Sequence, residues 1–271
     1  MSNQITQPDT YLLGMDKSTL RRYALFDEIY QPATAERFAT LPVSADMNVL
    51  EVGCGIGDTA CYLAKQVVPN GHVVAFDQSR ELVELGRQRA AASGIDNLEF
   101  VCAKAQEFQF DKECFDLVHT RFVLSYMRDA KEIVAKIYAA LRDSGIFLGE
   151  EIFQAYIKRN EPKWFRDIAT WFATLIEMGG GNPDYGLAQL PSDMLDAGFK
   201  DLKVTAQCPV RDQAKIAEML RLALANEMRK ALVDAKLTTG EEIDDDVAEM
   251  MSLPEEACIS VCMVAQVSGS K

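Results

Sequence analysis

A glycine-rich turn between an apolar strand and a helix carries the residues with the clearest chemistry in this chain. Glycines stand at positions 53, 55 and 57, directly after the apolar residues 49–52, in which Glu51 is the acidic member. Glycine lets a backbone turn sharply and approach a ligand at a distance that a Cβ atom would prevent. The pattern therefore predicts a binding site for a nucleotide-like cofactor at this turn.

Asp77 supplies a second carboxylate at the end of the next apolar segment, residues 72–76. A carboxylate has two oxygens, and each can accept a hydroxyl hydrogen, so one aspartate can hold both the 2′ and 3′ hydroxyls of a ribose. Because Glu51 lies in the strand end just before the glycines, the site carries two acidic groups. The pair favours a cofactor that has a ribose and a positive charge.

Two other kinds of nucleotide site fit the turn less well. The dinucleotide fingerprint needs its third glycine three residues after the second, where this chain has Asp58. A phosphate-binding loop needs Gly-Lys-Ser/Thr at the start of the helix, but the chain reads Gly57-Asp58-Thr59, whose carboxylate would repel a phosphate. An NAD(P)-dependent oxidoreductase, which would keep the turn and Asp77, is therefore a weaker alternative.

Strand and helix patterns alternate around the turn. Helical spacing of apolar residues predicts helices at residues 58–68 and 129–142, with another after Asp77. Apolar runs predict strands at residues 49–52, 72–76, 98–102, 115–119, 146–152, 202–207 and 258–267. The predicted fold is α/β, a doubly wound and mostly parallel seven-stranded sheet with helices on both faces. The cofactor is expected beyond the carboxyl ends of the strands.

The motifs and their order resemble those of the class I (Rossmann-like) S-adenosylmethionine-dependent methyltransferases. The first motif of that family reads Glu/Asp-x-Gly-x-Gly-x-Gly, which here is Glu51 to Gly57, and the resemblance covers residues 48–152. It implies S-adenosylmethionine as the cofactor and S-adenosylhomocysteine as the product. The methyl group would be transferred to an O, N or C atom of an acceptor by in-line displacement.

The resemblance also implies which residues contact the cofactor. Glu51 would orient the methionine ammonium, the glycine turn would lie against the methionine and ribose, and Asp77 would hold the ribose hydroxyls. The expected cofactor-binding residues are Glu51, Gly53, Cys54, Gly55, Gly57, Asp77, Gln78, Ala105, Gln106 and Thr120.

The adenine subsite departs from the family pattern. Many members place an Asp-Ala pair after the third strand, whereas this chain reads Lys104-Ala105. The adenine contact is therefore expected to come from Gln78, the backbone amide of Ala105 and the side chain of Gln106.

Charge and a missing motif indicate a small-molecule acceptor. The net charge of −13 disfavours nucleic acid and anionic membranes, which attract basic surfaces. The segment after the fourth strand reads His119-Thr120-Arg121-Phe122 and lacks Asn-Pro-Pro-Tyr, which family members that methylate base amines or glutamine amides usually carry. The sequence predicts a small metabolite as the acceptor and neither nucleic acid nor membrane as a partner.

His119 is the candidate general base, since histidine titrates near neutral pH. The favoured alternative is a strand-end histidine bonded to the backbone, because methyl transfer mainly requires alignment and the exclusion of water. Glu150 and Glu151 end the fifth strand, where one could contact a cationic acceptor and ordinary solvent exposure explains the pair as well. No metal site is expected, because the seven cysteines form no Cys-x-x-Cys pair and the chain has two histidines.

The chain is expected to form one methyltransferase domain over residues 1–271. An apolar helix at residues 162–178, followed by three glycines, is the candidate lid over the acceptor. The expected parts are an N-terminal helical cover at 1–45, a cofactor-binding core at 46–152, a lid insertion at 153–190 and a C-terminal sheet completion at 191–271. The cover contains Tyr11, Met15 and Arg22, which simple packing would explain equally well.

Several cysteines lie in apolar runs, as free thiols do in a reducing compartment. No segment approaches the roughly 18 apolar residues of a spanning helix, and residues 1–10 are polar. The sequence therefore predicts a soluble cytoplasmic protein, and it leaves a homodimer open. A protein that binds S-adenosylmethionine without turnover, as a sensor or a partner, is the second alternative.

Overall fold

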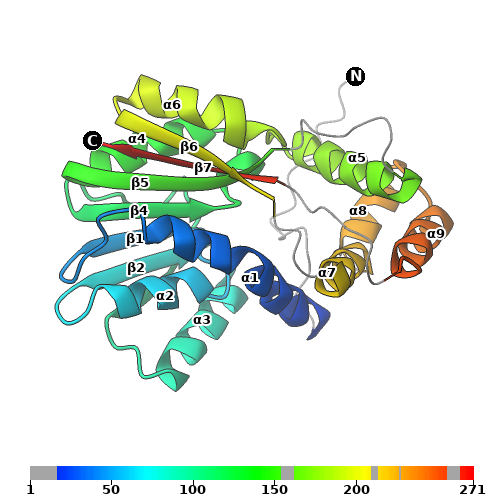
Figure 1. The fold of residues 1–271 in the computed structure, drawn as a ribbon, viewed down its shortest axis with the longest axis horizontal. Helices are drawn as coiled ribbons and strands as arrows, with labels where there is room; N and C mark the ends of the chain where they lie inside the picture. Colours follow the sequence, from blue (N-terminus) through cyan, green and yellow to red (C-terminus); the bar gives the residue numbers. More distant parts are fainter. Residues whose placement is uncertain (1–16, 154–161, 209–212, 226, 255–262) are drawn as a thin grey trace.

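The computed structural model describes residues 17–153, 162–208, 213–225, 227–254 and 263–271. A seven-stranded sheet with the order β3-β2-β1-β4-β5-β7-β6 forms its centre (Figure 1). The strands are β1 Asn48–Val52, β2 His72–Asp77, β3 Leu98–Cys102, β4 Phe115–Arg121, β5 Leu141–Phe153, β6 Lys200–Gln207 and β7 Met263–Ser270. Strands β1 to β5 pair in parallel, and β7 lies antiparallel between β5 and β6. The predicted doubly wound, mostly parallel sheet is confirmed.

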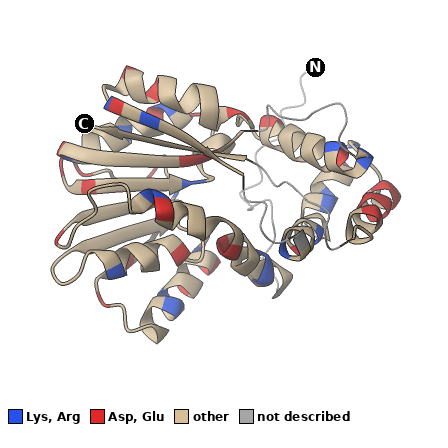
Figure 2. Ribbon diagram, viewed as in Figure 1, with Lys and Arg blue, Asp and Glu red and all other residues tan. Residues whose placement is uncertain are grey.

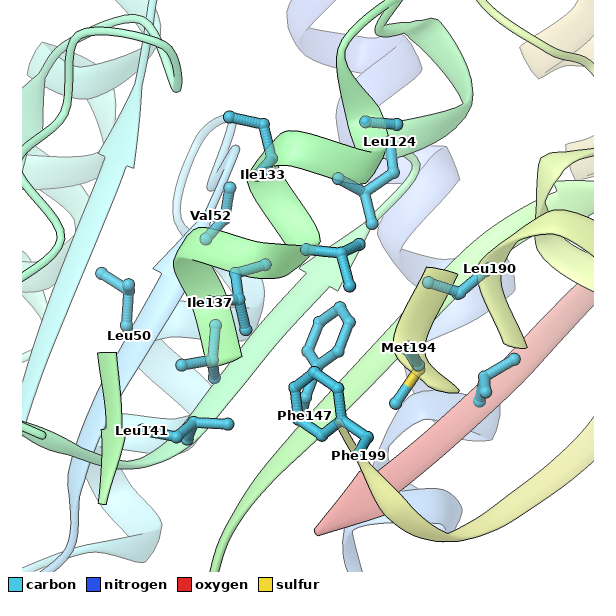
Figure 3. Packing of buried hydrophobic residues seen from close by; sticks show 14 of the residues in the cluster. Leu50, Val52, Leu124, Ile133, Ile137, Leu141, Phe147, Leu190, Met194 and Phe199 are labelled. Carbon is cyan, nitrogen blue, oxygen red and sulfur yellow. The ribbon is translucent and has the colours of Figure 1, made fainter. Parts of the chain in front are cut away.

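Helices cover both faces of the sheet. Helices α2 and α3 pack on one face together with the end of α1, and α4 and α6 pack on the other. Figure 3 shows Ile137 of α4, Met194 of α6 and Phe147 of β5 in one buried apolar cluster. The helices are α1 Lys17–Phe38, α2 Asp58–Gln66, α3 Arg80–Ala92, α4 Ala130–Ala140, α5 Lys163–Met178, α6 Leu190–Ala197, α7 Gln213–Ala225, α8 Glu227–Asp234 and α9 Gly240–Met251.

Helices α5, α7, α8 and α9, here named the helical cap, gather beside the carboxyl ends of the parallel strands (Figure 1). Their apolar faces meet one another and α1, with Trp164, Trp171, Leu232 and Ile243 among the buried side chains. Residues 191–271, which were expected to complete the sheet, do so through β6 and β7 and also supply three cap helices. Helices α7 and α8 lie on either side of residue 226, which is outside the described part.

The acidic run at residues 241–246 starts α9, as its composition predicts (Figure 2). Thr239 and Glu242 form a capping box there, which satisfies two N–H groups of the first turn. Within the described residues, no helix is long and apolar enough to cross a membrane. The described part also contains no group of three or more His, Cys, Asp or Glu side chains that could hold a metal ion.

Candidate active site

The glycine turn lies at the carboxyl end of β1 and leads into α2. Gly53, Gly55 and Gly57 have φ values of +70°, +54° and +81°, in the left-handed region that favours glycine. A Cβ atom at Gly53 would lie 2.3 Å from Cγ2 of Val123, and one at Gly57 would lie 2.6 Å from Cζ of Phe100. The backbone conformation therefore favours glycine at all three positions, and the available space favours it at Gly53 and Gly57 as well.

The N–H groups of the turn are used inside the protein. Gly53 and Cys54 both donate to the carbonyl oxygen of Phe76 at 2.9 Å, and Gly57 donates to the carbonyl oxygen of Cys54 at 2.9 Å. Gly55 donates to Oδ2 of Asp77 at 3.0 Å. These bonds fix the shape of the turn, and they leave none of these four donors for an anionic group of a ligand.

Asp77 ends β2 with a carboxylate that is held in place from two sides. Its Oδ1 accepts a hydrogen bond from the Ser79 N–H at 2.9 Å, and its Oδ2 accepts the bond from Gly55. Burial raises the pKa of Asp77, although these backbone donors act in the opposite direction. A carboxylate oxygen can accept two hydrogen bonds, so this fixed group retains acceptor capacity for a pair of hydroxyls.

His119 of β4 is fully buried between two carboxylates. Its Nδ1 lies 2.8 Å from Oε2 of Glu51 on β1, and its Nε2 lies 2.9 Å from Oε2 of Glu150 on β5. Burial alone would lower the pKa of His119, but the two carboxylates outweigh it and raise the pKa to about 9. The ring is therefore an imidazolium at neutral pH, with a proton on each nitrogen. The alternative of a histidine bonded to the backbone is wrong.

Glu150 extends this network to two further elements. Its Oε2 accepts from the Thr34 hydroxyl of α1 at 2.7 Å, and its Oε1 accepts from the Gln266 amide of β7 at 2.5 Å. Burial acts to raise the pKa of Glu150, but the hydrogen bond and charge of His119, with the charge of Arg121, lower it overall. The solvent exposure expected for Glu150 and Glu151 is wrong, because α1 and β7 enclose this part of β5.

Glu151 anchors the segment that follows β4. Its carboxylate accepts from the N–H groups of Val123, Leu124 and Ser125 at 3.1, 2.9 and 3.0 Å, and from the Ser125 hydroxyl at 2.8 Å. Burial raises the pKa of Glu151 despite these donors. The Thr120 hydroxyl, expected near the cofactor, also points to Glu151, at 3.5 Å. This buried carboxylate thus fixes Val123, the side chain that packs on Gly53.

The residues expected around the adenine lie at the ends of β2 and β3. Gln78 and Gln106 are exposed, and Ala105 packs partly against the core. The Gln106 amide donates to Oδ1 of Asp129 at 3.1 Å, so this side chain is held toward the start of α4.

Cys54, in the turn, has a pKa raised well above the usual thiol value by burial and by the Asp77 and Glu51 carboxylates. Its thiol is therefore protonated at neutral pH.

Aromatic side chains of α1 border the site, a feature that the sequence analysis missed. The rings of Phe26 and Tyr30 each lie 4.9 Å from the ring of Phe122, which directly follows β4. Cε1 of Tyr23 lies 3.4 Å from the position of a Cβ atom at Gly55. Arg121 donates to Asp27 of the same helix at 3.2 Å. Helix α1 therefore lies over the glycine turn and the end of β4.

The fold and the glycine turn together define an α/β protein that has a nucleotide-type cofactor site at the carboxyl ends of its parallel strands. Residues 43–188 match the family described as a methyltransferase domain. The chain belongs to this family, and it is an S-adenosylmethionine-dependent methyltransferase of the small-molecule type.

Curated relatives are about a quarter identical to this chain over the aligned residues. Demethylmenaquinone methyltransferase of Listeria welshimeri is 26% identical over 178 residues, which cover 60% of this chain and 75% of that protein. The ubiquinone/menaquinone biosynthesis C-methyltransferase UbiE of Vibrio campbellii is 27% identical over 174 residues, which cover 58% of this chain and 65% of that protein.

Solved structures show the same fold. The YcgJ protein from Bacillus subtilis has a TM-score of 0.62 at 17% identity, and the match covers 88% of this chain and 97% of the YcgJ chain. Phosphoethanolamine N-methyltransferase 2 of Haemonchus contortus, in complex with phosphomonomethylethanolamine and S-adenosylhomocysteine, has a TM-score of 0.60 at 17% identity. That match covers 94% of this chain and 57% of the other.

Proposed function

We propose that this chain methylates a small apolar acceptor with an aromatic or similarly planar ring. The observation that carries the proposal is the ring cluster of Phe26, Tyr30 and Phe122 beside the glycine turn. Aromatic walls favour planar apolar ligands, both by the area that they bury and by ring-to-ring geometry. Demethylmenaquinone, which the name of the Listeria relative gives, is a molecule of this kind.

The residues of the turn fit S-adenosylmethionine. Oε2 of Glu51 faces His119, and Oε1 is the oxygen that we assign to the methionine ammonium. We assign the ribose hydroxyls to Asp77, because its carboxylate is fixed and retains acceptor capacity. Gly53, Cys54, Gly55, Gly57, Gln78, Ala105, Gln106 and Thr120 are proposed as the remaining contacts, with Thr120 contributing through its backbone because its hydroxyl points to Glu151.

When bound, S-adenosylmethionine supplies an electrophilic methyl group on a sulfonium. The task of the protein is then to align the acceptor with that methyl group and to exclude water. We propose that His119 serves this alignment by holding Glu51, rather than as the general base. An imidazolium that donates to two buried carboxylates has no lone pair with which to accept a proton.

We propose that the insertion at residues 153–190 acts as a lid through α5; residues 154–161 of the insertion lie outside the described part. The buried side chains Trp164, Ile168 and Trp171 lie on one face of this helix, toward the other cap helices and α1. Closing over a ligand should slow amide hydrogen exchange in α5 when S-adenosylhomocysteine and acceptor are both bound. Helix α6, which packs on the core through Leu190 and Met194 and carries none of the proposed cofactor contacts, serves as the internal control. Unchanged exchange in α5 would contradict a lid.

The acceptor class is tested with S-adenosylmethionine labelled in its methyl group. We expect the enzyme to label the fraction of a bacterial extract that contains small molecules soluble in organic solvent. Label confined to water-soluble metabolites would overturn the apolar acceptor, and label in protein or nucleic acid would overturn the small-molecule acceptor. Binding of the cofactor with all fractions unlabelled would favour a protein that binds it without turnover.

We also propose that the protein is located in the cytoplasm and that it forms a homodimer. Five described cysteines, Cys54, Cys61, Cys102, Cys114 and Cys208, are free thiols, which supports a reducing compartment. Cell fractionation tests the location, and light scattering of the purified protein tests the dimer.

A further inference from the structure

Helix α1 buries a positive charge beside the site. Arg22 is 7% exposed, and its Nη2 atom is buried without a hydrogen-bond partner among the residues that the structure describes. A buried guanidinium nitrogen without an acceptor is costly, because a polar N–H that is removed from water and left unbonded loses its hydration. Its position therefore indicates an anionic group that the described part of the protein does not supply.

Arg22 is a neighbour on α1 of the residues that border the cofactor turn and the ring cluster. Its guanidinium carbon lies 4.6 Å from the ring centre of Tyr23, the residue whose Cε1 approaches Gly55. One helical turn further along, Phe26 contacts Phe122 with ring centres 4.9 Å apart. Residues at i and i+4 lie on the same face of a helix, so Arg22 and Phe26 face the same region.

The other arginines around the site have acceptors. Arg121 donates to Asp27, Gln31 and Thr34, and Arg37 donates to the hydroxyl of Ser268. Arg89 pairs with Asp58 at the start of α2. Arg37 leaves its Nε without a partner, but both of its Nη atoms have acceptors. Among these described arginines, Arg22 is the one with a buried Nη atom that has no acceptor.

The cofactor that the proposed function requires carries one anionic group, the carboxylate of its methionine part. The charged side chains at the turn, Glu51, Asp58 and Asp77, repel an anion, and the N–H groups of Gly53, Cys54, Gly55 and Gly57 are already used. The carboxylate therefore needs a cation from outside the turn. A charge-assisted bond from a guanidinium is among the strongest ways to hold a carboxylate.

We propose that Arg22 binds the methionine carboxylate of S-adenosylmethionine and thereby ties α1 to the bound cofactor. The inference rests on the proposed function, since it assigns a residue to that cofactor. The ammonium and the carboxylate of the same amino-acid part would then be held from opposite sides, by Glu51 on β1 and by Arg22 on α1. Loss of Arg22 should weaken only ligands that contain the carboxylate.

Calorimetric titration with two ligands tests this assignment. S-adenosylhomocysteine carries the amino-acid part, and 5′-methylthioadenosine has the same nucleoside and sulfur without it. In the Arg22→Met variant, the Kd of S-adenosylhomocysteine should rise about 10- to 150-fold, as for a lost hydrogen bond to a charged group. The Kd of 5′-methylthioadenosine should stay unchanged.

The matched control is Arg21→Met, because Arg21 is exposed and pairs with Glu218 at 3.1 Å. It should leave both Kd values unchanged. An equal loss of affinity for both ligands in Arg22→Met would overturn the assignment and indicate a structural role. Unchanged affinity for S-adenosylhomocysteine would also overturn it, and a raised KM for the acceptor alone would then assign the anion to the acceptor. A wild-type protein that binds neither ligand would instead contradict the proposed function.

Discussion

Replacing His119 with glutamine is expected to lower the free energy of unfolding by about 3 to 5 kcal/mol at pH 7, the range for removal of one member of a buried ion pair. Glutamine can donate one amide to one carboxylate, but it carries no charge. The carboxylates of Glu51 and Glu150 would then stay buried without the positive charge that His119 places between them. Denaturant unfolding monitored by circular dichroism measures the change.

The same variant should reveal a dependence on pH. The pKa of His119 is raised from 6.5 to about 9 in the folded state, so its proton stabilises the fold fully below pH 6.5. This stabilisation is lost as the pH rises through 9, and the difference between wild type and His119→Gln should therefore shrink between pH 7 and pH 10. His72→Gln is the control, because the His72 side chain is 45% exposed. A difference that stays constant over this range would contradict a buried imidazolium.

Replacing Asp77 with alanine is expected to raise the Kd of S-adenosylhomocysteine by about 10- to 150-fold, which corresponds to the loss of hydrogen bonds to a charged acceptor. The carboxylate both holds the turn through Gly55 and offers its remaining acceptor capacity to the ribose. Both contributions act in the same direction. Calorimetric titration of the purified variant measures the affinity.

Asp116→Ala provides the matched control for this effect. The Asp116 carboxylate also accepts a bond from a backbone N–H, that of Asn48 at 2.7 Å, but at the opposite end of β1. We expect this change to affect stability and to leave the Kd of S-adenosylhomocysteine unchanged. Unchanged affinity in Asp77→Ala would remove Asp77 from the site.

The sequence predicts the sheet well because its central strands β1, β2 and β4 are largely buried and read as short apolar runs between turns. The predicted ends of β2 and β3 agree with the structure to within one residue. Strand β5 starts at Leu141, directly after α4, and not at residue 146 as predicted. The prediction missed this start because residues 142–144 are polar and exposed. The polar residues 142–144 hide a strand start from any analysis of apolar periodicity.

The network around His119 could not be predicted from the sequence, because it depends on the register between strands that are distant in the sequence. Glu51 pairs with His119 across β1 and β4, and Glu150 pairs with Arg121 across β4 and β5. A sequence shows that each of these residues ends an apolar strand, but it does not show which side chains share a face. Two adjacent acidic residues inside an apolar strand were the available signal.

Arg22 was missed as a site residue for a related reason. The buried face of α1 carries Thr19, Arg22, Thr34 and Arg37 as well as apolar residues. Apolar periodicity therefore does not identify the face of α1 that packs on the sheet. The role of these polar residues can be inferred only from the structure, which shows the sheet and the carboxylates that face α1.

The most direct test of a methyltransferase cofactor site at the turn is a calorimetric titration of the wild-type protein with S-adenosylhomocysteine and, separately, with NADH. The account predicts binding of S-adenosylhomocysteine at one site per chain and no heat of binding with NADH. Both ligands carry an adenosine ribose, so the comparison depends on what lies beyond it. Binding of NADH without binding of S-adenosylhomocysteine would contradict the account and favour an oxidoreductase.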